Sequence, residues 1–321
     1  MDLSNHTRVN EFIITGFPNL QNIKVPIFVL VLIMYTLSLT GNLVIVFITR
    51  HEPSLHTPMY FFLGNFSFLE ICFTSVTVPT MLVDLMRENN IVSFNNCLAQ
   101  IYFFHGLGGV ECLLLAAMAY DRYVAIRSPL RYNTIMSSTV YIQLAAWSWV
   151  IGLVLPLIPV ILISRLNYCD SHVVDHFFCD ILPLLRLVCN RTQLNEMLSF
   201  FICSFILVGS FTVTIVSYAA IIITVLRIPS SAGRKKAFST FASHLTVVGV
   251  FYGTMMFIYV RPTRNLSFNM DQVVAVFYCL VTPVLNPIIY SLRNKEVKTA
   301  LKKALFAKRG TAMKSKGSVK G

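Results

Sequence analysis

Seven apolar runs occur along this chain, each long enough to cross the hydrocarbon core of a lipid bilayer. A spanning helix needs about 20 such residues to cross roughly 30 Å. Backbone groups in lipid must be hydrogen bonded within their own segment, and these runs are too continuously apolar for barrel strands. The sequence therefore predicts an all-α membrane protein, a seven-transmembrane helix bundle. The predicted spans are residues 25–49, 59–83, 98–124, 140–163, 197–226, 238–260 and 273–292.

Composition and charge agree with this fold class. Hydrophobic residues make up 55% of the 321 residues and charged residues 12%, whereas ordinary soluble domains carry about 25% charged residues. Most of the 26 Lys and Arg residues lie on the same side of the predicted membrane as the C-terminus, and basic loops face the cytoplasm. We therefore expect a multi-pass protein with an extracellular N-terminus and a cytoplasmic C-terminus. The net charge of +12 reflects this topology and gives no support to nucleic-acid binding.

The predicted regions are an extracellular N-terminus at 1–24, a seven-transmembrane domain at 25–292 and a cytoplasmic tail at 293–321. The first 20 residues are polar and lack the apolar core of a signal peptide, so the first span is expected to act as an uncleaved insertion signal. In the tail, Val297 and Leu301 lie at helical spacing against Lys298 and Lys302. This pattern predicts a short amphipathic C-terminal helix on the inner leaflet.

Cysteine placement agrees with the predicted orientation. Cys97, Cys169, Cys179 and Cys189 fall outside the membrane, and Cys72, Cys112, Cys203 and Cys279 fall within spans. Four cysteines in an oxidising compartment predict two disulfides, for which the sequence alone allows three pairings.

The N-terminus also carries a candidate glycosylation site. Asn5-His6-Thr7 is an acceptor sequon. The sequons at Asn190 and Asn265 are also predicted to lie outside, whereas the one at Asn65 falls within the second span. We expect Asn5 to carry the glycan.

An acid and a base, Asp121 and Arg122, are adjacent where the third apolar run meets a basic segment. A charge near the bilayer is costly, so the pair indicates a functional site. We expect the two side chains to pair with each other in the resting state, since a low dielectric strengthens their attraction. Alternatively, Arg122 is a passive anchor that reaches the lipid headgroups.

Glu70 and Glu111 are acids within predicted spans. Two carboxylates cannot cheaply stay ionised together at that depth, so they could share a proton or bind a cation. The alternative is that one or both are neutral and hydrogen bonded to neighbouring helices.

Several motifs resemble those of a known family. Seven spans, an outside N-terminus and the Asp121-Arg122-Tyr123 triplet resemble the rhodopsin-like (class A) G-protein-coupled receptors. The landmark residues of that family have counterparts here in Gly41-Asn42, Trp149, Tyr218 and Asn286-Pro287-Ile288-Ile289-Tyr290. Within that family, residues 55–63 (LHTPMYFFL), 118–126 (MAYDRYVAI), 217–218 (SY) and 236–240 (KAFST), followed by Ser243-His244, look like olfactory receptors.

The resemblance implies an odorant receptor in the plasma membrane and not an enzyme. A small, neutral volatile ligand would bind in the outer half of the bundle and activate a stimulatory olfactory-type heterotrimeric G protein and adenylyl cyclase. On activation, Arg122 would leave Asp121 and turn toward Tyr218 and Tyr290. The residues assigned to this G-protein switch are Asp121, Arg122, Tyr123, Tyr218, Asn286, Pro287 and Tyr290.

The resemblance also implies which residues face the ligand. Most are apolar, His105, Tyr252 and Tyr259 would be polar anchors, and Phe104 stands where amine-binding relatives have an acid, which favours a neutral ligand. The expected ligand-binding residues are Phe104, His105, Gly108, Gly109, Ile202, Cys203, Ile206, Tyr252, Met255, Met256, Tyr259, Val276 and Cys279.

Two further expectations come from the resemblance. It implies disulfides between Cys97 and Cys179 and between Cys169 and Cys189, with Cys97 to Cys189 as the alternative. It also implies a sodium ion as a possible allosteric ligand near Glu70 and Glu111. No other cofactor or metal is expected.

Three other functions fit the sequence less well than an odorant receptor. A receptor for a lipid or peptide would need larger or charged contacts, and the short segment before the first span offers few. A secondary transporter could hold intramembrane acids and broken helices, but the chain shows no paired halves with matching interruptions. An enzyme is disfavoured because no cluster of nucleophile, base and orienting group is apparent.

Overall fold

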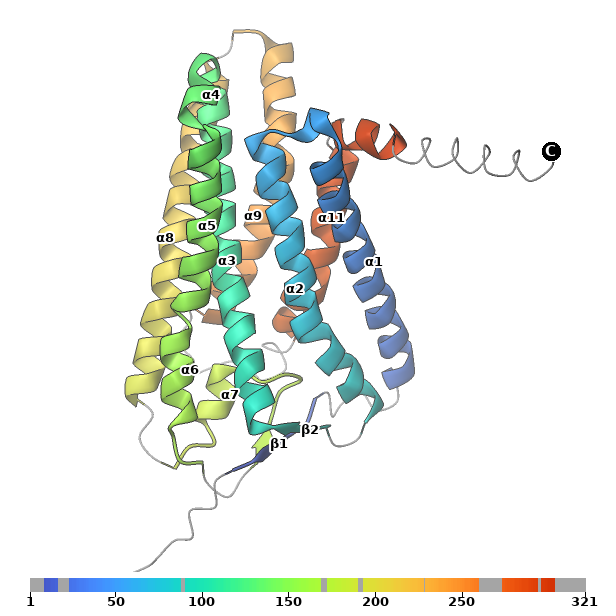
Figure 1. The fold of residues 1–321 in the computed structure, drawn as a ribbon, viewed down its shortest axis with the longest axis vertical. Coiled ribbons are helices and arrows are strands. Elements are labelled where there is room, and N and C mark those ends of the chain that lie inside the picture. The colour runs from blue at the N-terminus through green and yellow to red at the C-terminus, as the bar shows by residue number, and fades with distance from the viewer. Residues whose placement is uncertain are drawn as a thin grey trace, which may run out of the picture.

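The computed structural model describes residues 9–16, 23–87, 90–168, 172–189, 193–227, 229–259, 273–293 and 296–303, with the backbone alone at 235–244, 258–259 and 290–293. Long, nearly parallel or antiparallel helices form a bundle (Figure 1). Its long helices are α1 (Lys24–His51), α2 (Pro58–Met86), α3 (Phe94–Arg127), α5 (Ser138–Val154), α8 (Gln193–Leu226) and α9 (Ser231–Tyr259). The last apolar segment is the π-helical turn η4 (Phe277–Val281) followed by α11 (Thr282–Arg293).

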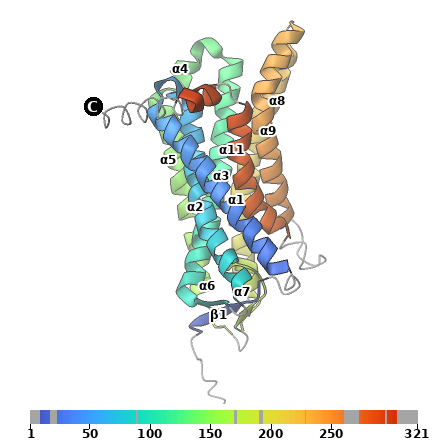
Figure 2. The same cartoon turned by 90° about the vertical axis from the view of Figure 1, so that its right-hand side faces the viewer.

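These helices account for the seven apolar runs. Lys24–His51, Pro58–Met86, Phe94–Arg127, Ser138–Ser164 and Gln193–Leu226 are long and apolar enough to span a membrane, and Leu245–Phe257 and Val273–Ile289 are shorter apolar helical segments. The predicted seven-helix bundle is confirmed. The C-terminal helix is present at residues 296–303, with Val297 and Ala300 buried and Lys302 and Lys303 exposed, and it lies across one end of the bundle (Figures 1 and 2).

The fourth span differs from the single run predicted at 140–163. It breaks into α5 and α6 (Leu157–Ser164), and Pro156 is the residue that precedes α6. A proline lacks the backbone N–H that would continue the hydrogen-bond ladder and clashes with the preceding turn, so it breaks the helix there.

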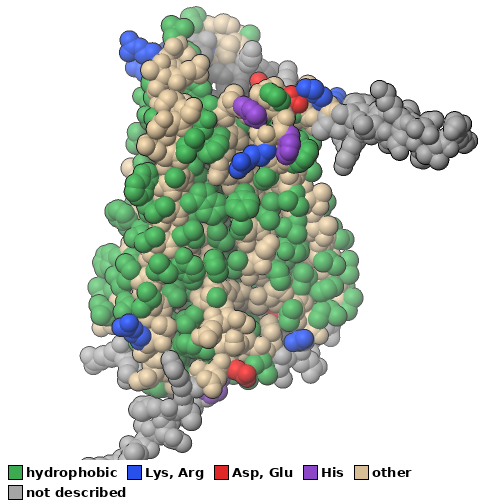
Figure 3. All heavy atoms as spheres, in the orientation of Figure 1, with side chains coloured by type: hydrophobic (Ala, Val, Ile, Leu, Met, Phe, Trp, Pro, Cys, Tyr) green, Lys and Arg blue, Asp and Glu red, His purple; other side chains and the backbone are tan. Residues whose placement is uncertain are grey.

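Helix α3 lies at the centre of the bundle. In its most apolar stretch 78% of the residues are buried, against 22% in α1. The apolar residues of α1 that face outward, such as Val25, Leu30 and Phe47, are exposed. Hydrophobic side chains cover most of the middle of the molecule in Figure 3, and charged and His side chains lie near its two ends. Such a surface fits contact with lipid along the sides and with water at the ends.

One end of the bundle, which we term the outer end, is closed by a small sheet below the helices in Figure 1. Strand β1 (Glu11–Ile14) lies between β2 (Asn90–Ser93), antiparallel to it, and β3 (Val173–Val174), parallel to it. Phe12 is completely buried and packs against the rings of Phe94 and Tyr168. The N-terminal strand is thus held in place by segments far away in the sequence.

The opposite end, which we term the inner end, carries short helices. They are η2 (Pro53–Leu55) between α1 and α2, and η3 (Pro129–Arg131) with α4 (Tyr132–Ile135) between α3 and α5. The helix at 296–303 also lies there, because Tyr60 donates a 2.5 Å hydrogen bond to Glu296 and Lys303 forms a 2.9 Å ion pair with Glu52.

Candidate ligand cavity and switch

A cavity of about 50 Å³ lies in the outer half of the bundle, between α3, α6, α7 (Ile181–Leu185), α8 and α9. Its lining is almost entirely apolar. Eight of the expected ligand-binding residues line it: Phe104, His105, Gly108, Gly109, Ile202, Cys203, Ile206 and Met255. Sequence reasoning missed five others, which are Cys112, Pro156, Pro159, Ile181 and Leu207. Pro156 and Pro159 reach the cavity at and beyond the break in the fourth span.

Four other expected ligand residues, Tyr252, Met256, Val276 and Cys279, are not part of the cavity lining. Tyr252 is buried and donates a 3.2 Å hydrogen bond to the backbone carbonyl of Cys112, which lines the cavity. Cys279 is buried in the core, and Met256 and Val276 pack against that core while partly exposed. The side chain of Tyr259 lies outside the described residues.

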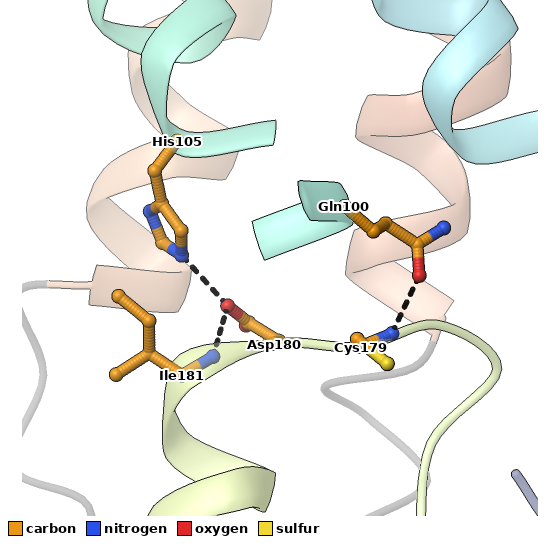
Figure 4. Close-up of polar contacts among 5 residues, drawn as sticks. All are labelled: Gln100, His105, Cys179, Asp180 and Ile181. Carbon is orange, nitrogen blue, oxygen red and sulfur yellow. Dashed lines mark hydrogen bonds and ion pairs between the residues drawn. The ribbon is translucent and has the colours of Figure 1, made fainter. Parts of the chain in front are cut away.

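His105 forms the polar edge of the cavity. Its Nε2 lies 2.8 Å from Oδ1 of Asp180, and the two side chains are only 8% and 12% exposed. The same oxygen accepts a 2.7 Å hydrogen bond from the backbone N–H of Ile181, which opens α7 (Figure 4). A buried carboxylate must be paired and hydrogen bonded to be tolerated, and Asp180 meets both conditions.

The charge state of Asp180 follows from these contacts. Burial on its own would raise the pKa of this carboxyl, but the hydrogen bond from His105 and the charge of that imidazole bring the pKa below its ordinary value. Asp180 is therefore ionised at neutral pH, and its negative charge faces the imidazole. Sequence reasoning chose His105 but missed Asp180, because the two residues lie 75 positions apart.

A disulfide and an amide side chain hold the Asp180 loop on α3. Cys97 is joined to Cys179, which is the pairing that the resemblance implies. The side chain of Gln100 accepts a 3.0 Å hydrogen bond from the backbone N–H of Cys179 (Figure 4). Its amide nitrogen donates to the backbone carbonyl of Val76 and the hydroxyl of Thr80 in α2. Gln100 thereby connects α2, α3 and the loop, a role for which its sequence context gave no signal.

Of the second disulfide, the structure describes one cysteine, Cys189, which is disulfide-bonded. Since Cys97 pairs with Cys179, the alternative of Cys97 with Cys189 is excluded. Cys169 lies outside the described residues, as does Asn5.

Glu70 and Glu111 lie deep in the bundle, 1% and 2% exposed. Asn286 of α11 donates a short hydrogen bond to Glu70, and the hydroxyl of Tyr278 donates a 2.9 Å hydrogen bond to Glu111. Among the residues that the structure describes, no group of three or more His, Cys, Asp or Glu side chains forms a metal site. Each carboxylate is thus held by a neutral donor from the seventh span.

The prolines of α11 explain why α1 carries Gly41 and Asn42. Pro287 has no N–H to offer the carbonyl of Pro283, four residues earlier, which would leave a buried acceptor unpaired. Ser38 and Asn42 each donate a 3.3 Å hydrogen bond to that carbonyl. A Cβ on Gly41 would come within 3.1 Å of the Pro287 ring, so glycine permits this close approach.

Asp121 lies within α3 and not at its end, because the helix continues to Arg127. The charge of Arg122 acts on Asp121, but no close ion pair joins the two among the described residues. The buried Asp121 instead accepts a 2.7 Å hydrogen bond from the Tyr132 hydroxyl of α4. Adjacent residues of a helix do not face each other, so Asp121 turns inward while Arg122 stays partly exposed.

The other expected switch residues are distributed along the inner half of the bundle. Tyr218 of α8 is buried, Tyr123 of α3 is partly exposed, and Asn286 is bound to Glu70. The side chain of Tyr290 lies outside the described residues.

Comparison with known proteins places the chain among its relatives. A family profile described as "Olfactory receptor" matches residues 31–308. The chain is 49% identical to olfactory receptor 226 of Rattus norvegicus, with 100% of both chains covered. It is 47% identical to human olfactory receptor 6N1 (95% of this chain and 98% of the relative) and 48% identical to human olfactory receptor 6A2 (94% of each). The chain belongs to the olfactory receptor family, whose members are seven-transmembrane odorant receptors.

Proposed function

We propose that a small, neutral volatile molecule binds in the outer cavity and activates a stimulatory olfactory-type heterotrimeric G protein, and through it adenylyl cyclase. One observation carries the choice of a neutral ligand. Of the described lining residues, His105 is the one that can carry a positive charge, and Asp180 already faces it at 2.8 Å. An ionised ligand would have to break this pair or stay without a counter-charge in an apolar site, and either is costly.

The size of the cavity suggests how binding is coupled to activation. A space of about 50 Å³ is close to the volume that one or two water molecules occupy. An odorant must therefore separate parts of the lining, and Met255 of α9 and Ile206 of α8 are wall residues on helices that could move. A ligand that binds the widened form better than the narrow form shifts the population toward it.

Helix α3 provides a direct route from the cavity to the inner end. Cys112 lines the cavity and Asp121 lies on the same helix, about 14 Å further along at 1.5 Å per residue. Tyr252 of α9 is hydrogen bonded to the Cys112 carbonyl, so movement of α9 acts on α3 beside the cavity. We propose that the inner end then opens, that Arg122 moves toward Tyr218 and Tyr290, and that the G protein binds there.

The proposed orientation places the outer end in the extracellular space and the inner end in the cytoplasm of a cell with this receptor in its plasma membrane. The disulfide between Cys97 and Cys179 supports it, since disulfides form in oxidising compartments. The basic residues at the other end support it as well.

We also propose a sodium ion as an allosteric ligand near Glu70 and Glu111. Carboxylate oxygens suit a hard cation, and two buried carboxylates that repel each other gain from a positive charge between them. Purified receptor should melt at a higher temperature in sodium chloride than in choline chloride, and Glu111→Gln should abolish the difference. Equal melting of the native receptor in both salts would contradict the sodium proposal and favour neutral carboxyl groups.

A cyclic-AMP reporter assay in cells tests the main proposal. The receptor is exposed to a chemically diverse odorant panel, with a parallel measurement of its amount at the cell surface. We expect responses to neutral volatile compounds and not to their permanently charged analogues. Silence from a well-expressed receptor across every chemical class would contradict it.

A further inference from the structure

A second cavity, of about 160 Å³, lies at the inner end, between α1, η2, α2 and α5. It is separate from the ligand cavity and shares no lining residue with it. Its wall combines polar and apolar side chains. The polar and cationic side chains that line it include Arg50, His56, Thr57, Asn65 and Tyr141.

The charges around this cavity favour an anion. Arg50 and His56 are exposed, and no acidic residue is among the lining residues. The nearby acid, Glu52, accepts hydrogen bonds from Lys303 and Ser54, so Lys303 offsets its charge. No described residue forms an ion pair with Arg50. A planar guanidinium with its donors unused is well suited to the oxygens of a phosphate group.

The backbone adds to this preference. Helix α2 begins at Pro58, directly after Thr57, whose side chain makes no capping hydrogen bond. The positive end of the α2 dipole therefore faces the cavity that Thr57 and Tyr60 line. The ring of His56 is fixed, because its Nε2 lies 3.2 Å from the backbone carbonyl of Arg50 and must donate to it. In the neutral ring the other nitrogen is a hydrogen-bond acceptor, so Arg50 and the N-terminus of α2 provide the attraction for an anion.

The apolar part of the cavity leads toward the middle of the membrane. Phe61 and Gly64 line it, and Phe68 follows on the same face of α2 at helical spacing. Phe68 is 51% exposed and contacts the ring of Trp149 of α5. On the α1 side, Phe47 is likewise exposed. Figure 3 shows Arg or Lys and His side chains near the inner ends of α1 and α2, with hydrophobic side chains between that point and the outer end.

We propose that this cavity binds the phosphate of an anionic membrane phospholipid, with the acyl chains along the apolar face of α2 between α1 and α5. The polar and cationic residues lie at headgroup depth, and the exposed apolar residues continue from them in the direction that the acyl chains must take. A soluble phosphate compound would contact the polar and cationic residues but would have no acyl chains to pack on the exposed apolar residues. With the proposed orientation, the lipid belongs to the inner leaflet.

Native mass spectrometry of the purified full-length receptor tests this site. The receptor is incubated with dioctanoyl phosphatidylinositol 4-phosphate, with dioctanoyl phosphatidylcholine, or with soluble inositol 1,4-bisphosphate. We expect the anionic lipid to bind more tightly than the other two compounds. Arg50→Gln should weaken its binding by roughly fivefold, the contribution of one basic residue at a membrane surface, and Arg50→Lys should retain part of it. Arg227→Gln, which removes a basic residue at the same end but outside the cavity, is the matched control and should bind as the native receptor does.

Three outcomes would overturn the proposal. Equal losses in Arg50→Gln and Arg227→Gln would mean attraction by the charged surface as a whole. Equal binding of phosphatidylcholine would exclude recognition by charge. Equal binding of inositol bisphosphate would assign the site to a soluble phosphate compound.

A photo-crosslinking experiment on the native receptor makes the test independent of any variant. A phosphatidylserine with a diazirine in its acyl chain should crosslink to the peptide that contains residues 61–68. Crosslinks confined to other helices would contradict the proposed path of the acyl chains.

Discussion

The two ends of the bundle are held together in different ways. At the outer end, the disulfide Cys97–Cys179, a three-stranded sheet and the buried pair of His105 with Asp180 connect the loops to α3. At the inner end, the described links between segments include single side-chain contacts such as Tyr132 with Asp121 and Lys303 with Glu52. The loops of the outer end are therefore fixed to α3, whereas the inner end can change its arrangement at small cost.

This difference fits a receptor that binds its ligand at one end and signals at the other. The wall around a ligand must stay anchored while the ligand widens the cavity, so covalent and buried polar links are useful there. A signalling surface must have two arrangements that differ by only a few kcal/mol. Asp121 shows the contrast well, because one hydroxyl of a short loop helix holds it in place of the expected ion pair.

Removal of the outer disulfide is expected to have the largest effect. Loss of a native disulfide typically costs about 2–5 kcal/mol, and this one closes a loop of 82 residues over the ligand cavity. Cys97→Ser should leave little receptor at the cell surface, measured by antibody labelling of intact cells. The control is Cys72→Ser, which removes a free and partly exposed thiol. Normal surface amounts of Cys97→Ser would show that the outer end does not depend on this link.

A buried histidine at the outer end should make stability depend on pH. Burial lowers the pKa of His176 to about 4, although Asp180 and Asp175 act in the opposite direction. The unfolded chain, with an ordinary histidine pKa of about 6.5, binds a proton in this range more readily than the folded protein does. Stability is therefore lost as the pH falls from about 6.5 to about 4, by up to about 3 kcal/mol.

The variant His176→Phe should remove this part of the pH dependence and keep the ring contacts with Phe177 and Phe178. Thermal unfolding of both proteins between pH 7 and pH 4.5 measures it, with the exposed His172→Gln as control. A melting temperature that falls equally in the native receptor and His176→Phe would contradict the assignment to His176.

A smaller effect is expected where α1 meets α11. Asn42→Ala removes one of the two side chains that donate to the Pro283 carbonyl and should cost about 1–2 kcal/mol. The measurement is the melting temperature of the purified receptor. Thr36→Ala removes an exposed hydroxyl that bonds within the same helix and should have almost no effect. Equal melting temperatures of the two variants would show that the hydrogen bond from Asn42 to the Pro283 carbonyl does not stabilise the receptor.

The sequence predicted the seven spans because the thickness of a bilayer fixes the length of each apolar run. Through the family resemblance it also predicted eight of the residues that line the cavity. The N-terminal strand was missed, because Phe12 and Ile14 are buried only by the partner strands β2 and β3. The partners of Asp180 and Asp121 were missed for a similar reason: side-chain pairs between distant or loop segments depend on how the chain packs and not on local pattern.

In the proposed function, the outer cavity recognises the odorant and the inner end transmits the signal. Two variants separate these roles. A Cβ on Gly108 would lie at ordinary contact distance from Tyr278 and Met255, so Gly108→Val fills the cavity without a backbone clash. Gly209→Val is the matched control, because a Cβ there meets no atom within 4 Å. Arg122→Ala removes the proposed switch residue at the inner end.

The most direct measurement is the binding of one activating odorant to each purified receptor, by thermal-shift titration, beside the cyclic-AMP response of cells with equal surface amounts. Gly108→Val should lose both binding and response, Arg122→Ala should bind normally and lose the response, and Gly209→Val should match the native receptor. Unchanged odorant binding in Gly108→Val, or a normal cyclic-AMP response in Arg122→Ala, would contradict the division between the two ends.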